Sequence, residues 1–289
     1  MIKSKKLRTG NGCKFSNFRI IGDGEVILGD DVTIGEGVIF NIKGGGHCTV
    51  GDRSIIGDHF VIEGRDIEIG KEFWSGRYCG IGGGSCMEKY SKLRIGDFGH
   101  LGDFSFINTA RPVIIGDEVG LGQETKIYTH GAYESFLRGF PVEFGPVTLE
   151  NCVWCPKAII MPNVTIGHDT VVGAGAIVTK SLPSGCLAVG IPAKVIKENV
   201  FPKKFGEKET EVMLCDFVKK FKENAEYNKF QHEIQVVGDR VFVDGTLFHL
   251  GEMRIDGKVT ETTEKFRNEL RRYGVRFRYH EKGGAYVSW

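Results

Sequence analysis

Histidine is the residue type in this chain that is best suited to proton transfer at neutral pH. An imidazole has an ordinary pKa of about 6.5, so it can take a proton from an attacking hydroxyl or amine. His130 follows Leu121 and Ile127, two hydrophobic residues six positions apart, and begins the longest irregular stretch of the chain, which ends near Pro146. We take His130 as a candidate general base, although its position alone fits a surface loop histidine equally well. Four other histidines are expected to be solvated side chains of loops or outward positions: His47, His59, His100 and His168.

The elements that would position this histidine follow from a repeat. Glycine makes up 41 of the 289 residues, well above its usual share. Pairs of an aliphatic residue followed by glycine recur six residues apart. A period of six fits neither an α-helix nor a simple two-sided strand, but it suits short strands joined at regular corners, where glycine tolerates the corner geometry. The aliphatic positions are Leu28 and Ile34, Val50 and Ile56, Ile95 and Leu101, Ile115 and Leu121, and Ile166 and Val172.

The constant spacing of six residues distinguishes between two possible β architectures. A β-sandwich of glycine-punctuated hairpins would also be rich in glycine, but hairpins rarely keep so regular a step. We therefore predict a parallel β-helix, in which aliphatic side chains point inward and stack from coil to coil. The period is interrupted at residues 42–48, 82–93 and 130–146, and we expect these stretches to leave the coil as loops. Loops on a rigid scaffold often carry function.

Two segments resemble a known family. VTIGHDTVVGAGAIVTKSLPSGCLAVGIPAKVIKE, from Val164 to Glu198, contains two last repeats, a short loop with proline and the run Gly190-Ile191-Pro192-Ala193-Lys194. Upstream, IIGDEVGLGQETKIYTH is followed by a loop and by PVTLENCVW. Together they resemble the hexapeptide-repeat acyltransferases, especially the maltose/galactoside and xenobiotic acetyltransferase group. The resemblance covers roughly residues 20–198.

This resemblance implies a left-handed β-helix that assembles as a homotrimer, with CoA in the cleft between subunits and His130 at the position of the family's base. The reaction would move an acetyl group from acetyl-CoA to a hydroxyl, less readily an amine, of a sugar or polysaccharide precursor. One departure concerns Cys155-Pro156, which stands where an aliphatic-glycine pair is usual. The alternative is a non-catalytic β-helix scaffold that presents its C-terminal region to a protein partner.

The resemblance also implies a set of CoA-binding residues. Trp154 would flank the CoA arm, and Gly173 and Ala174 would leave room for the arm beside the backbone. Lys180 and Lys194 match basic positions near the nucleotide, where cations pair with phosphates. Taken singly, each lysine fits a solvated surface charge, and the tryptophan fits core packing.

The sequence indicates the residues that would bind the acceptor less clearly than those that would bind CoA. Polar side chains in and near the loop 131–145 could hydrogen-bond a polar acceptor, and the aromatic residues of the loop could stack on one, but all of them could equally be ordinary loop or corner residues. The polar candidates are Asn108, Glu134, Arg138 and Glu143, and the aromatic ones are Tyr133, Phe136 and Phe140.

A metal-dependent reaction is the other chemistry that this architecture could host. A trimeric carbonic anhydrase of related fold needs three histidines that converge on zinc, two of them five positions apart. No two histidines of this chain have that spacing, and the residue five positions after His100 is Ser105. We therefore expect no metal requirement for catalysis.

A different pattern begins after the repeats. We divide the chain into a left-handed β-helix acyltransferase domain, residues 1–198, and a small C-terminal α+β appendage of unknown role, residues 199–289. Gly238-Asp239, Asp244-Gly245 and Gly283-Gly284 predict hairpin turns. Two helices are predicted from apolar stripes, the first from Leu214, Phe217, Val218, Phe221 and Ala225, and the second from Val259, Phe266, Leu270 and Tyr273 before Gly274.

The composition limits the classes of partner that the protein is expected to bind. The net charge of +1 and the 26% of charged residues favour neither nucleic acid nor an anionic membrane. No apolar run reaches the roughly 18 residues of a bilayer crossing, so we expect no membrane span. The eight cysteines are scattered, which is typical of reduced thiols and a cytoplasmic location.

Overall fold

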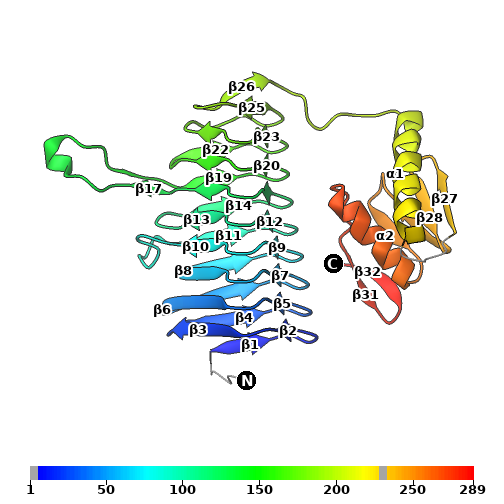
Figure 1. Ribbon diagram of the computed structural model, residues 1–289, viewed down its shortest axis with the longest axis horizontal. Coiled ribbons are helices and arrows are strands. Elements are labelled where there is room, and N and C mark those ends of the chain that lie inside the picture. The colour runs from blue at the N-terminus through cyan, green and yellow to red at the C-terminus, as the bar shows by residue number, and fades with distance from the viewer. Residues whose placement is uncertain (1–5, 228–232) are drawn as a thin grey trace. The chain divides into compact units, whose positions relative to one another are not determined.

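The computed structural model describes residues 6–227 and 233–289, and only the backbone of residues 225–227. The chain divides into two compact units, with the boundary between Pro202 and Lys203. The first unit is a parallel β-helix and the second is a small α+β domain (Figure 1). The predicted fold class is confirmed.

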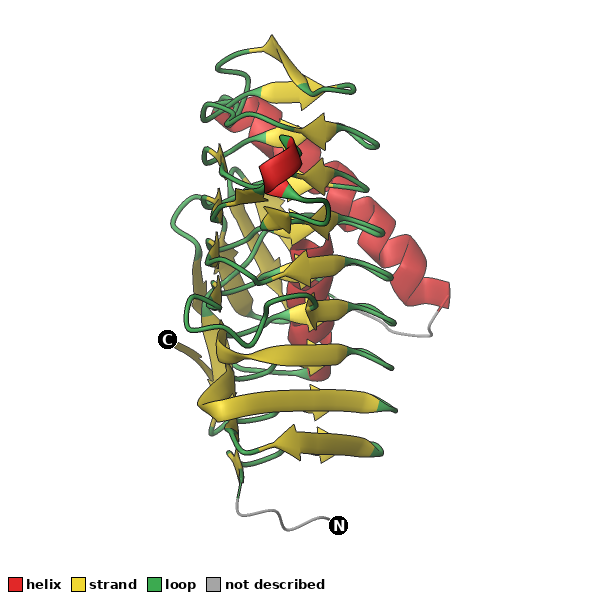
Figure 2. Ribbon diagram, turned by 90° about the vertical axis from the view of Figure 1, so that its left-hand side faces the viewer, coloured by secondary structure: helices red, strands yellow, loops and turns green. Residues whose placement is uncertain are grey.

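Stacked coils with three faces make up the β-helix (Figures 1 and 2). The long strands β6 and β8 bend around a corner, so that β8 pairs with β10 near one end and with β11 near the other. They thereby join two faces into one 14-stranded sheet, and a ten-stranded sheet forms the third face.

The 14-stranded sheet contains β1 (Leu7–Thr9), β3 (Phe18–Gly22), β4 (Glu25–Leu28), β6 (Val38–Val50), β8 (Val61–Ile69), β10 (Gly80–Gly82), β11 (Leu93–Ile95), β13 (Phe106–Asn108), β14 (Val113–Ile115), β16 (Lys126–Ile127), β19 (Val147–Leu149), β21 (Ile159–Ile160), β22 (Val164–Ile166) and β24 (Ile177–Val178). The ten-stranded sheet contains β2 (Lys14–Phe15), β5 (Thr33–Ile34), β7 (Ile55–Ile56), β9 (Trp74–Ser75), β12 (His100–Leu101), β15 (Gly120–Leu121), β20 (Trp154–Cys155), β23 (Val171–Val172), β25 (Leu187–Val189) and β26 (Lys194–Lys197).

The predicted inward positions stack in register. Ile95 pairs with Ile115, which pairs with Leu149, which pairs with Ile166, and all four side chains are buried. Burial of one such side chain stabilises the fold by about 1.5–3 kcal/mol. Cys155 takes an inward position beside Leu121 and is fully buried. The coil therefore keeps its register where the usual aliphatic-glycine pair is missing.

The glycine that follows an inward residue is explained by the neighbouring coil. Asp52 Oδ1 accepts a hydrogen bond from the Asp30 N–H at 3.0 Å, and a Cβ on Gly29 would lie 2.3 Å from the same oxygen. A side chain at Gly29 would therefore displace the carboxylate that satisfies the corner backbone. The same arrangement recurs at Gly35 with Asp58, Gly76 with Asp103, and Gly96 with Asp117.

The three interruptions of the period fold differently from one another. Residues 42–48 lie within β6, so our prediction of a loop there is wrong. Gly44 and Gly45 both have φ +63°, which lets the strand turn a corner and resume pairing after a shift of register. Residues 83–92 form a loop between β10 and β11, close to the prediction.

The third interruption forms an arm. Its root is the antiparallel pair β17 (His130–Gly131) and β18 (Glu143–Phe144), and between them lies the 3₁₀ helix η1 (Phe136–Arg138). Figure 1 shows this arm projecting from the side of the β-helix.

The second unit has two helices and two antiparallel sheets. Its elements are α1 (Glu207–Tyr227), β27 (Ile234–Val237), β28 (Arg240–Val243), β29 (Thr246–His249), β30 (Arg254–Asp256), α2 (Glu261–Arg272), β31 (Tyr279–Lys282) and β32 (Ala285–Ser288). All three predicted hairpin turns are confirmed.

Both predicted helices of this unit are confirmed as well. Leu214 and Phe217 of α1 are buried in one core with Phe266 of α2, whereas the side chain of Ala225 lies outside the described residues. Thr260 caps α2 by accepting the Thr263 N–H, an arrangement that satisfies a free backbone donor. Within the described ranges, no helix combines the length and the apolar character of a membrane crossing.

Candidate active site

His130 lies where the chain leaves its coil. The preceding residue Thr129 is fully buried, and its carbonyl accepts the Gly145 N–H at 2.9 Å. His130 itself pairs with Phe144 across the root of the arm. Both strands of the arm are therefore fastened to the β-helix beside the imidazole.

A buried asparagine holds the imidazole. Asn108 is only 2% exposed. Its Nδ2 donates to the carbonyl oxygens of Gly82 at 2.9 Å and Gly84 at 3.2 Å, and carbonyl oxygens can only accept. Its Oδ1 must then face the remaining partners, Thr129 Oγ1 at 2.6 Å, His130 Nδ1 at 2.8 Å and the Ala110 N–H at 3.3 Å.

This network determines which imidazole nitrogen carries the proton. Because Asn108 Oδ1 only accepts, His130 Nδ1 donates, and in the neutral ring Nε2 holds the free lone pair. Nε2 has no hydrogen-bond partner in the part of the chain that the structure describes. A Cβ on Gly84 would lie 3.2 Å from Nε2, so the glycine keeps the space beside this nitrogen free. The corner presents one basic nitrogen in a fixed orientation.

Residues that the sequence did not point to form a row of contacts that begins at the ring. Phe144 stacks on the imidazole, with centroids 5.4 Å apart and planes at 19°. The Arg111 guanidinium lies 4.4 Å from the Phe144 ring and 5.0 Å from the Tyr90 ring, and its Nη1 pairs with Glu88 Oε2 at 3.1 Å. The sequence could have indicated Glu88 and Tyr90, because both belong to a loop that interrupts the repeat. No feature of the sequence indicated Arg111.

The predicted acceptor residues separate into two groups. Asn108 lies beneath His130, and Glu143 lies on the strand opposite Gly131, where its Oε1 accepts from Asn163 Nδ2 at 3.1 Å. Glu134 and Arg138 lie farther out on the arm and are exposed. Of the four, Asn108 is the residue that contacts the imidazole, whereas the Glu143 carboxylate contacts Asn163.

The predicted CoA residues lie on the last coils of the β-helix. Trp154 is 42% exposed, and its ring packs over Gly120, where a Cβ would come within 2.4 Å of the indole. Gly173 lies against Val189, the residue that pairs with Lys194. Gly173 and Lys194 are thus brought close together.

The segment that carries Lys194 folds back over the preceding coil. The Ala193 N–H donates to the Ile177 carbonyl at 2.8 Å, and that coil continues to the exposed Lys180. Ala174, also exposed, follows Gly173 at the same end. No hydrogen bond or ring contact joins any of these residues to His130 within the described residues.

His47 and His100 are partly buried, which differs from our expectation of solvated side chains, whereas His59 and His168 are exposed. His100 stacks on Trp74, with centroids 4.7 Å apart, and lies 6.5 Å from the Trp154 ring. His47 Nε2 lies 3.4 Å from Asp66 Oδ1 and 3.6 Å from Glu68 Oε1. Neighbouring coils bring these partners together, and they are distant in the sequence.

Comparison with known proteins adds the family context. The galactoside O-acetyltransferase of Escherichia coli is 35% identical over 89 residues, which are 30% of this chain and 44% of the relative. WcaF of Escherichia coli, provisionally named a colanic acid biosynthesis acetyltransferase, is 34% identical over 110 residues, 38% of this chain and 60% of the relative. The curated relatives are acetyltransferases. The predicted resemblance is therefore confirmed.

The extent of these matches is limited. The chain spans about half the length of the curated relatives that it matches, and no protein-family model matches it. A solved hexapeptide-repeat acetyltransferase of Vibrio cholerae is 23% identical, with a TM-score of 0.37 over 52% of this chain and 73% of that chain.

Proposed function

We propose that this protein is a CoA-dependent O-acetyltransferase. It moves an acetyl group from acetyl-CoA to a hydroxyl, less readily an amine, of a sugar or polysaccharide precursor. The observation that carries the proposal is the Asn108–His130 hydrogen bond of 2.8 Å, which leaves Nε2 as a free and oriented base. The names of the curated relatives support acetyl transfer and a sugar acceptor.

In the proposed step, His130 Nε2 takes the proton of the acceptor hydroxyl while the hydroxyl oxygen attacks the thioester carbonyl carbon. The carbon–sulfur bond then breaks, and the CoA thiolate takes the proton back from the imidazolium. Asn108 acts as a positioning residue, because its Oδ1 stabilises the Nδ1–H of the imidazolium and keeps the ring in one orientation. This role replaces the direct acceptor contact that we expected for Asn108.

We assign CoA binding to the last coils. Trp154 offers an exposed aromatic face for the CoA arm, and Gly173 and Ala174 leave the backbone accessible beside it. Lys180 and Lys194 are exposed cations that would pair with the phosphates of CoA. Glu134, Arg138 and Glu143 are kept as acceptor contacts of the arm.

We further propose a homotrimer in which the arm of one subunit reaches another. Its support is the exposure of large apolar side chains on the arm, 99% for Tyr133, 82% for Leu137 and 69% for Phe136. Exposed apolar side chains gathered in one place mark interaction surfaces. Within the described part of one chain, the proposed CoA-binding residues make no hydrogen bond or ring contact with His130. A second subunit would bring its own CoA-binding residues to this histidine.

Two further proposals concern the part of the chain that carries out the reaction and the cellular compartment of the protein. We place the transferase in residues 1–198 and treat residues 199–289 as an appendage outside the reaction. A cytoplasmic location is supported by the scattered spacing of the eight cysteines, which is typical of thiols that stay reduced in that compartment.

Calorimetry with acetyl-CoA tests the proposed function. The full-length chain should bind acetyl-CoA, and Lys194→Glu should weaken binding by about tenfold or more because it replaces a phosphate-pairing cation by an anion. Lys14→Glu, a charge reversal on the exposed strand β2, is the matched control and should bind normally. No binding by the unmodified chain would remove the CoA assignment.

A further inference from the structure

A cavity of about 380 Å³ lies on the N-terminal side of the His130 corner. The turn of β6 at Gly44–Gly46 forms one wall, together with Arg65, and the loop between β10 and β11 forms another with Lys89, Tyr90 and Lys92. These are two of the three places where the six-residue period is interrupted. The cavity is thus built from the irregular parts of the β-helix.

The glycine turn holds Arg65 at this cavity. Arg65 Nη2 donates to the Gly44 carbonyl at 3.3 Å. A Cβ on Gly46 would lie 2.0 Å from the Arg65 carbonyl oxygen, and one on Gly44 would lie 3.0 Å from the guanidinium. Side chains at these two positions would push the arginine away, so the turn and the cation form one unit.

Positive charge predominates in the cavity. Arg65, Lys89 and Lys92 line it, and no ion pair is formed by these three within the described residues. Lys89 lies 4.9 Å from the centroid of the Tyr90 ring, a contact that leaves its charge intact. The acidic residue in the lining is Asp66, whose Oδ1 lies 2.8 Å from Arg94 Nη2.

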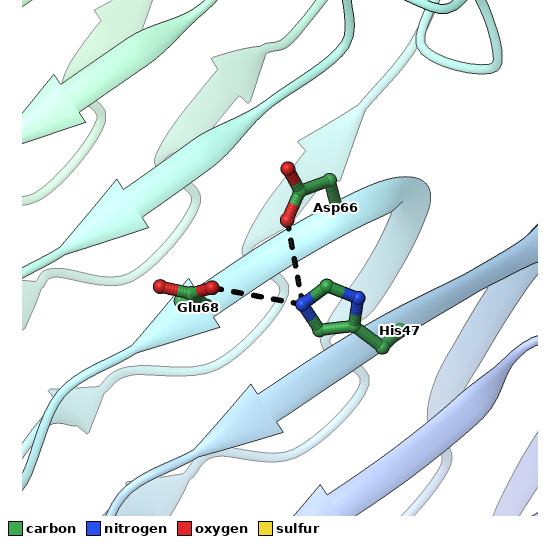
Figure 3. A group of neighbouring side chains, drawn as sticks. All are labelled: His47, Asp66 and Glu68. Atoms are coloured by element: carbon green, nitrogen blue, oxygen red, sulfur yellow. Dashed lines mark ion pairs between the residues drawn. The ribbon is translucent and has the colours of Figure 1, made fainter.

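The neighbouring carboxylates do not make this a cation site. Figure 3 shows His47, Asp66 and Glu68 grouped on adjacent strands, an arrangement that could hold a metal ion. Arg94, however, pairs with both carboxylates, at 2.8 Å to Asp66 and at 2.6 Å from its Nε to Glu68. A guanidinium that already neutralises both acids competes directly with a metal ion, and the cations of the cavity stay uncompensated.

Contacts connect the cavity to the imidazole. Tyr90 lines the cavity and packs under Arg111, Arg111 packs on Phe144, and Phe144 stacks on His130, with successive separations of 5.0, 4.4 and 5.4 Å. Three successive contacts thus link the wall of the cavity to the imidazole of His130.

We propose that the cavity binds an anionic group of the acceptor, a carboxylate or a phosphate, while a hydroxyl of the same molecule reaches His130. This inference rests on the proposed acetyl transfer and deepens it, because it names the acceptor as an acidic saccharide. Arginine and lysine together suit either anion, because both anions accept charge-assisted hydrogen bonds.

Calorimetry with three matched probes tests the inference: cellobiose, cellobiouronic acid and cellobiose 1-phosphate. The full-length chain should bind one or both charged probes at least tenfold more tightly than cellobiose, which also tells a carboxylate from a phosphate. Lys92→Gln should remove most of this preference, about tenfold in affinity, and Arg65→Gln should do the same. Lys14→Gln, a lysine of β2 outside the cavity, should leave it unchanged.

Other outcomes are decisive as well. Equal affinity for the three probes, or a Lys92→Gln effect that falls on acetyl-CoA instead of the charged probe, would overturn the inference. Acetyl-CoA titrated into the same samples separates the two proposals. Normal acetyl-CoA binding without a charge preference removes the acidic acceptor alone, whereas absent acetyl-CoA binding removes the transferase.

Discussion

The regular corners of the β-helix and the corner at His130 use a polar side chain in two different ways. At a regular corner, the carboxylate of Asp52 accepts one backbone N–H of the neighbouring coil, and the repeat continues. At the His130 corner, Asn108 donates to one carbonyl at the end of β10 and to one in the inserted loop. It accepts from a threonine, an imidazole and a backbone N–H. The regular corner serves the fold alone. The irregular one also orients the imidazole of His130, the base that we propose, at a point where the six-residue period is interrupted.

The largest effect should come from the base itself. His130→Ala should lower kcat for acetyl transfer by about two to four orders of magnitude, the usual contribution of a general base. The affinity for acetyl-CoA and the melting temperature should change little, because His130 lies outside the buried core. Steady-state kinetics and calorimetry measure both. Unchanged turnover would remove His130 from the mechanism.

The second-largest effect should be a loss of stability when an inward side chain of the coils is shortened. Ile107 is fully buried between Ile81 and Ile127 of the neighbouring coils, and Ile107→Ala should lower the free energy of unfolding by about 2–5 kcal/mol. Urea denaturation measures the change. Ile114→Ala, at a half-exposed outward position, is the control and should cost far less. Equal losses would contradict the inward stacking.

The positioning role of Asn108 predicts a smaller and more specific loss. Asn108→Ala should lower kcat by about 10- to 100-fold, as expected for a residue that orients another, with the KM for acetyl-CoA unchanged. NMR spectra of the protein labelled with ¹⁵N-histidine should show that His130 no longer carries its proton on Nδ1 alone. An unchanged tautomer would contradict the assignment, even if activity fell.

Asp52→Ala is the matching change at a regular corner. It removes the hydrogen bond to the Asp30 N–H, and the free energy of unfolding should fall by about 1 kcal/mol. Acetyl transfer by the folded variant should equal that of the unmodified chain. Thermal denaturation and a transfer assay measure the two quantities. A loss of activity as large as that of Asn108→Ala would abolish the distinction between the two corners.

The last prediction concerns the reactivity of cysteine thiols that are buried within the coils, where we expect the smallest effect. Burial raises the pKa of Cys48 to about 12 and that of Cys79 to about 11, because the surroundings disfavour the thiolate. At pH 8 both should therefore stay protonated and resist a thiol reagent, whereas the exposed Cys152 and Cys215 should react quickly. Raising the pH should deprotonate Cys79 before Cys48. Mass spectrometry of labelled peptides identifies the sites. Rapid labelling of Cys48 would show that water enters the coils.

The β-helix was predictable from the sequence because its signal is local and repeated. Most coils contribute an inward aliphatic residue followed by glycine, and stacking acts between equivalent positions such as Ile95, Ile115 and Leu149. The two helices and three hairpin turns of the second unit were predictable for a similar reason, since apolar stripes and glycine turns lie within short windows. His130 stood out because it begins the longest interruption of the period.

The surroundings of His130 depended on contacts between residues that are distant in the sequence. The role of Asn108 follows from carbonyl groups more than 20 residues upstream, and Arg111 meets Tyr90 and Phe144 only after the coils stack. The corner at Gly44–Gly46 was wrongly expected to leave the coil, because a glycine run can end a strand or bend it while pairing continues. A six-residue period determines how each coil stacks on the next. The side chains that meet at its interruptions are decided only in the folded molecule.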